Sequence, residues 1–242
     1  MKSFTFIFIS VFSGAIAGTI FGVINLGIVE PFLDNAIGIE VQNAIKDGET
    51  IDQNELQSYR IWQKVGQITG GTILGLSFGA LFGITFIFGR NILPGSNNRR
   101  KAVVLAGILW LVIFVIPALK YPANPPTVGD PETIYERQNM YIIFTAISGI
   151  TALALAVIYK KMDGNPVKKF ALISAVYGIV MIAAFIILPQ NPDEITAPID
   201  LVQGFRIASG FSMSVFWLLL GIIFGSLWEK FKPHLNQRIT TF

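Results

Sequence analysis

The sequence has 242 residues, of which 52% are hydrophobic and only 14% are charged, with a formal net charge of +3. This composition excludes an ordinary soluble domain, and the absence of cysteine excludes disulfides, a thiolate nucleophile and a thiolate metal site. Because the apolar residues come in blocks about as long as a bilayer is thick, the sequence predicts an all-α integral membrane protein.

Six segments are apolar over the roughly 20 residues that a helix needs to cross a hydrocarbon core about 30 Å thick. They run over residues 4–29, 66–89, 102–119, 140–159, 170–188 and 207–227. We therefore expect residues 1–242 to form a single membrane domain, a bundle of six transmembrane helices.

The first segment has a second interpretation. A lysine, an apolar run and Ala-Ile-Ala at residues 15–17 imitate a secretory signal with its cleavage site, and cleavage would leave five spans. The run continues apolar to Val29, which is longer than a signal core. A retained first helix is the preferred interpretation.

Glycines recur at every fourth residue of the first two segments, which places them on one face of each helix. They are Gly14, Gly18 and Gly22 on the first segment and Gly71, Gly75, Gly79 and Gly83 on the second. Small residues let helix backbones approach closely in lipid, where apolar burial gives no drive for helices to associate. We expect these two helices to pack tightly, a contact that cleavage would destroy.

The segment 30–65 between the first two spans is polar. Asp52, followed three residues later by Glu55, is typical of a helix start with acids near its positive end. We expect a short external helix here that runs into the second span.

Basic residues are distributed unevenly about the spans. The two termini and the loops 90–101 and 160–169 hold 12 of the 18 lysines and arginines but only 2 of the 15 acids. The loops 30–65, 120–139 and 189–206, called here the acid-rich loops, hold the other 13 acids. Because basic loops stay in the cytoplasm, we expect a multi-pass protein of the cell membrane with both termini cytoplasmic and the acid-rich loops outside.

Each acid-rich loop ends on an arginine at the start of the next span, so the chain reads as three helical hairpins. These arginines are Arg60, Arg137 and Arg206. The second and third loops share Pro-Ala-Asn-Pro at 122–125 and Pro-Gln-Asn-Pro at 189–192, which favours parallel repeats, although chance also produces matches this short. Charges at a membrane boundary need partners, so we expect one of these arginines to pair with Glu30.

Two explanations of the acid-rich loops stay open. In the first, proline and asparagine end the helices while acids keep an external surface solvated. In the second, the acids form a vestibule that concentrates cations before they enter the bundle. The candidate cation contacts are then Glu30, Asn124, Asp130, Glu132, Asn191 and Asp193.

Several kinds of chemistry have no motif in this sequence. It has no phosphate-binding loop, no Ser-His-Asp set and no acid at the centre of a span, so we expect no enzyme, no tightly bound cofactor and no nucleic-acid partner. Hydroxyl groups within the spans are expected to bond to their own helices. Asn25 is expected to make a hydrogen bond between helices.

The second acid-rich loop carries a family resemblance. Residues 120–138 read KYPANPPTVGDPETIYERQ, which resembles the signature of the CbtA-type cobalt transporter subunits. The Glu30-Pro31 turn, the Arg-Ile-Trp-Gln entry at 60–63 and Phe216-Trp217 are also similar. The resemblance implies a subunit for cobalt uptake that feeds cobalamin synthesis and pairs with a small histidine-bearing subunit, CbtB.

Two features depart from that family. We count six spans where the family is usually described with five, and the only imidazole belongs to His234 in the tail. Late first-row ions favour nitrogen ligands, so this chain alone would select Co²⁺ poorly. A CbtB-like partner would supply nitrogen; otherwise the ion would pass partly hydrated between carboxylates and carbonyls.

Two functions follow from these observations. The first is a transport subunit in the lipid bilayer for a divalent transition-metal cation, with Co²⁺ bound only transiently. The alternative is a structural or accessory subunit of a larger membrane complex, because no charged site lies in the middle of the spans.

Overall fold

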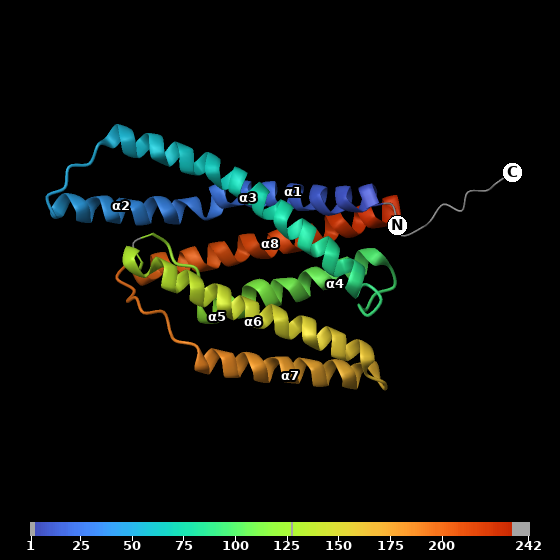
Figure 1. The fold of residues 1–242 in the computed structure, drawn as a ribbon. Helices are drawn as coiled ribbons and strands as arrows, with labels where there is room; N and C mark the ends of the chain where they lie inside the picture. The colour runs from blue at the N-terminus through green and yellow to red at the C-terminus, as the bar shows by residue number, and fades with distance from the viewer. Residues whose placement is uncertain (1–2, 127, 234–242) are drawn as a thin grey trace. The chain divides into compact units, whose positions relative to one another are not determined.

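The computed structural model describes residues 3–126 and 128–233, and every regular element in these ranges is helical (Figure 1). Six stretches of this described chain are long and apolar enough to cross a membrane, which confirms the expected all-α membrane fold. They are Ser3–Ile28 (α1), Gln53–Gly89 (α3), Asn98–Lys120 (α4 Asn98–Leu109, η1 Trp110–Val115 and α5 Ile116–Lys120), Pro131–Lys161 (η2 Pro131–Thr133 and α6 Ile134–Lys161), Pro166–Ile187 (α7) and Ile199–Phe231 (α8). His234 lies outside the described residues.

Most of these helices extend beyond the apolar runs because polar residues start them. Helix α3 begins at Gln53, where the carboxylate of Asp52 accepts from the backbone N–H of Asn54 at 2.8 Å and of Glu55 at 3.3 Å. This confirms the helix that was expected to run into the second span. A further helix, α2 (Glu30–Lys46), was not predicted; proline at its second position suits a helix start, and Gly48 with φ +88° follows its end.

The chain divides into two compact units. The first unit comprises Met1–Pro31, Thr50–Ile108 and Gly210–Phe242, and it includes α1, α3, α4 and most of α8. The second comprises Phe32–Glu49 and Leu109–Ser209, and it includes most of α2, α6 and α7. The single membrane domain expected for residues 1–242 stays a prediction, and so does the repeat of three helical hairpins.

In the first unit, α1 and α3 cross with their backbones in contact through the predicted glycines (Figure 1). A methyl group built on Gly18 would lie 2.8 Å from the Cα of Gly75, and one on Gly79 would lie 2.8 Å from the Cα of Gly14. Only a hydrogen fits at such positions, so the tight packing of the first two spans is confirmed.

Two side-chain contacts add to this packing of the first unit. The hydroxyls of Thr19 and Thr72 lie 2.9 Å apart between α1 and α3. Ser212 on α8 donates to the side-chain oxygen of Asn25 on α1 at 2.6 Å, which confirms the expected hydrogen bond between helices.

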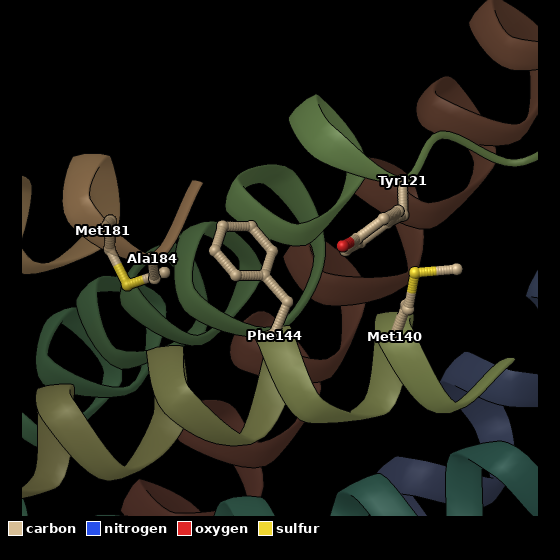
Figure 2. Close-up of a cluster of buried hydrophobic side chains, with 5 residues drawn as sticks. All are labelled: Tyr121, Met140, Phe144, Met181 and Ala184. Carbon is tan, nitrogen blue, oxygen red and sulfur yellow. The ribbon is translucent and has the colours of Figure 1, made fainter. Parts of the chain in front are cut away.

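In the second unit, α6 and α7 lie side by side as an antiparallel hairpin (Figure 1). Their contact contains a buried apolar cluster, in which the ring of Phe144 lies between Tyr121 on one side and Met181 and Ala184 on the other (Figure 2). Met140 on α6 and Tyr121, which follows α5, complete the cluster. The cluster thereby joins α6 and α7 to the residue that follows α5.

Candidate functional site

The first candidate centre surrounds Glu30, which is 3% exposed. One carboxylate oxygen accepts from the guanidinium of Arg60, and the other accepts from the side-chain amide of Gln67. The ammonium of Lys64 lies 3.7 Å from the same carboxylate. Positions 60, 64 and 67 follow helical spacing, so α3 presents all three side chains on one face. The expected pairing of Glu30 with an arginine is confirmed.

This environment determines what Glu30 can bind. Its single negative charge is already offset by the charges of Arg60 and Lys64, as burial of a carboxylate requires. The amide oxygen Oε1 of Gln67 is buried and has no hydrogen-bond partner in the described chain. A buried acceptor in this state is rare in folded proteins and marks a place for a water or an ion.

The second candidate centre surrounds Asp193, whose side chain is 7% exposed. Its Oδ2 lies 2.8 Å from Nε of Arg137, and both of its oxygens accept from the hydroxyl of Thr133, at 2.9 and 2.8 Å. The other guanidinium nitrogens of Arg137 donate to the carbonyls of Val128 at 3.2 Å and Asp130 at 3.0 Å. Arg137 therefore holds two parts of the second acid-rich loop together and also connects that loop with the third.

Gly129 makes room for this ion pair. Its φ of +99° lies in the region that favours glycine, and a methyl group built there would lie 2.6 Å from Cζ of Arg137. The turn favours glycine, and the absence of a side chain there lets the guanidinium approach closely. The Val-Gly-Asp part of the second acid-rich loop is therefore a cradle for Arg137.

The third arginine makes the reverse connection. Arg206, the last residue of the third acid-rich loop, donates to the side-chain oxygen of Asn124 in the second at 2.6 Å. The hydroxyl of Tyr121 also donates to the carbonyl of Pro189, at 2.6 Å. Thus an arginine of the second loop binds Asp193 of the third, and an arginine of the third loop binds Asn124 of the second.

The remaining candidate residues are less enclosed. Asp130 and Glu132 are exposed, and Asp130 accepts from the backbone N–H of Glu132 at 2.8 Å, which caps η2. The side-chain oxygen of Asn191 accepts from the backbone N–H of Asp193 at 3.2 Å. Within the described ranges, no three acids or histidines form a group that could hold a metal ion.

The structure therefore brings only some of the candidate residues together. Asp130, Asn191 and Asp193 gather around Arg137 in the second unit, and Asn124 lies with Arg206. Glu30 belongs to the first unit, where its partners are on α3.

Sequence reasoning missed a polar cluster in the middle of the spans. In η1 the backbone N–H of Ile116 donates to the carbonyl of Leu111, five residues back. The next donor in this π-helical pattern would be Pro117, which has no N–H, so the carbonyl of Val112 loses its backbone partner. The hydroxyl of Ser148 on α6 donates to that carbonyl at 2.6 Å instead.

The cluster extends to a third helix. The hydroxyl of Tyr177 on α7 lies 2.7 Å from that of Ser148, and the hydroxyl of Tyr141 donates weakly to the carbonyl of Ile113 at 3.5 Å. Ser148 is thus an exception among the span hydroxyls, several of which bond to their own helices as expected. Proline within an apolar run, opposite a serine and tyrosines, is the signal that could have revealed it.

Comparison with known proteins gave a family match, which covers most of the chain. A family model described as probable cobalt transporter subunit (CbtA) matches residues 4–229. No curated protein and no solved structure matches the sequence. Since the family model covers nearly all of the described residues, the chain belongs to the CbtA family of probable cobalt transporter subunits.

Proposed function

We propose that this chain is the membrane subunit through which Co²⁺ enters the cell. The observation that carries the proposal is the family match over residues 4–229, in a chain with six candidate spans. The charge distribution supports the direction, because basic loops are retained in the cytoplasm and the acid-rich loops would then face outward. A negative potential at these loops raises the local concentration of cations.

The candidate contacts suggest an order of encounter. Asp130 and Glu132 are exposed and would meet the hydrated cation first. Glu30 is buried and the side chain of Asp193 is 7% exposed, and both already hold arginines, so a cation would compete with Arg60 or Arg137 for their oxygens. The amide oxygens of Asn124 and Asn191 are further neutral contacts, and the unpaired Oε1 of Gln67 offers one beside Glu30.

Selection for cobalt needs a contribution from outside this chain. The proposed contacts are all oxygens, whereas late first-row cations prefer nitrogen ligands. A small histidine-bearing membrane subunit of the CbtB kind would supply imidazole, and Co²⁺ would be cargo that passes rather than a resident cofactor. This division of labour agrees with the family description, which names a subunit.

Cobalt accumulation in cells tests the proposal. A strain that lacks this chain, grown under cobalt limitation, should accumulate less ⁵⁷Co²⁺, and the wild-type chain should restore it. The double variant Asp130→Asn/Glu132→Gln should restore it several-fold less well at low Co²⁺, whereas Asp163→Asn, an exposed acid in a basic loop, should behave as wild type. Unchanged cobalt accumulation in the deletion strain would remove the cobalt claim.

Two features of the described chain support a second function. The described chain has no group of three potential metal ligands among its acids and histidines, and its two buried outer carboxylates are bound to arginines. Both features suit a structural or accessory subunit of a larger membrane complex. Purification in mild detergent distinguishes the two functions: a stoichiometric complex with enzyme subunits favours the accessory role, and a complex with a small histidine-rich helix favours transport.

A further inference from the structure

In the second unit, the polar cluster at Pro117 brings together oxygens from three spans. Ser148 is 0% exposed and Val112 is 6% exposed, whereas Tyr141 and Tyr177 are half-buried. It lies near the middle of its three spans, and those apolar runs, 102–119, 140–159 and 170–188, contain no charged residue. Its oxygens are therefore neutral and remote from ionised side chains along their own helices.

The hydrogen bonds leave part of each oxygen unused. Ser148 has one proton and donates it to the carbonyl of Val112, so Tyr177 must donate to Ser148. A carbonyl oxygen has two lone pairs and a hydroxyl oxygen accepts as well as donates, so Val112, Ser148 and Tyr177 each retain a lone pair. On the same helices, the carbonyl of Ile113 accepts weakly from the hydroxyl of Tyr141 at 3.5 Å, and these are two further neutral oxygens.

We propose that this cluster is a binding site for a monovalent alkali-metal cation, Na⁺, within the bilayer. Carbonyls released from helical hydrogen bonding, together with hydroxyls, are the ligands with which membrane transporters hold Na⁺. The cluster contains no carboxylate to offset the larger desolvation cost of a divalent ion, so Co²⁺ is excluded here. The role of the bound Na⁺ rests on the proposed function. The chain has no nucleotide-binding motif, so Na⁺ moving down its gradient would supply the free energy for cobalt uptake.

Direct binding of ²²Na⁺ to the purified chain in lipid nanodiscs tests the site. The wild type should bind ²²Na⁺ saturably, and unlabelled Na⁺ but not choline should displace it. Ser148→Ala and Tyr177→Phe should each raise the half-saturating Na⁺ concentration at least tenfold. Thr85→Val on α3, which removes a hydroxyl bonded at 2.8 Å to its own helix, should bind as wild type.

The outcomes separate the sodium site from the cobalt function. Tyr177→Phe removes one oxygen and keeps the ring, so a folded variant is expected, to be checked by gel filtration and circular dichroism. Absence of saturable ²²Na⁺ binding to the wild type, or wild-type binding by both cluster variants, overturns the inference. Sodium binding that the variants abolish, in a chain that carries no cobalt in proteoliposomes, overturns the proposed function and leaves the site standing.

Discussion

The helices within the first unit and those within the second are held together by different kinds of contact. In the first, α1 and α3 meet backbone to backbone along glycines, with a buried charge pair at one end. In the second, polar groups connect the helices and loops: arginines join two acid-rich loops, and hydroxyls join three spans at Pro117. Lipid gives helices no hydrophobic reason to associate, so close van der Waals contact and polar bonds are the two available means. Contact between helix backbones is prominent in the first unit, and polar bonds between helices and loops are prominent in the second.

The largest effect should come from filling the glycine contact of the first unit. A methyl group at Gly75 would collide with the carbonyl oxygen and Cα atoms of α1, neither of which can move independently of its helix. We therefore expect Gly75→Ala to yield little folded protein in detergent by gel filtration. Gly70→Ala on the same helix meets nothing within 4 Å and should fold normally. Equal recovery of the two variants would contradict the proposed packing.

The buried charges of the first unit should give the next effect. Removing one member of a buried ion pair typically costs about 3–5 kcal/mol, because the remaining charge is left without its partner. Glu30→Gln and Arg60→Gln should each lower the free energy of unfolding by an amount of this order, reduced by the presence of Lys64 near Glu30. The double variant should be more stable than the sum of the two predicts. Strict additivity in denaturant unfolding would show that the pair is not coupled.

The comparison becomes sharper with one glycine of the second unit. Gly129 and Gly164 both have positive φ, +99° and +111°, but only Gly129 faces an ion pair. Left-handed backbone costs a residue with a side chain about 1–2 kcal/mol, so both alanine variants should lose stability. Gly129→Ala should lose about 1–3 kcal/mol more, as crowding in a packed site does. Indistinguishable thermal unfolding of the two would argue against the cradle for Arg137.

The sequence was sufficient for features that depend on spacing along one helix. Glycines at every fourth position placed the contact of α1 with α3, and Asp52 three residues before Glu55 placed a helix start. Charge at the membrane boundary was also sufficient to expect an arginine beside Glu30, although the contributions of Lys64 and Gln67 were not foreseen.

The sequence did not predict features that depend on contacts between loops or between helices. The pairing of Arg137 with Asp193 depends on the turn at Gly129, and nothing in the local pattern links positions 56 residues apart. The bond of Ser148 to Val112 arises because a π-helical turn ends at a proline, which frees a carbonyl that only a neighbouring helix can satisfy. Tertiary contacts, rather than periodicity, determine both arrangements.

The smallest predicted effect concerns a helix start in the first unit. Asp52→Ala removes the acceptor of two backbone N–H groups at the start of α3 and should lower the free energy of unfolding by about 1 kcal/mol. Asn165→Ala, which removes the equivalent cap of α7, should cost a similar amount. Hydrogen exchange of the first turn of each helix would detect the change, and protection equal to the wild type would show that these caps contribute little.

Flux of ⁵⁷Co²⁺ into proteoliposomes tests the transport function most directly. Vesicles that contain this chain and a small histidine-bearing subunit should take up cobalt faster than empty vesicles, and Asp130→Asn/Glu132→Gln should reduce the initial rate. Flux no greater than that of empty vesicles, with both subunits folded and present, would contradict a role in cobalt transport.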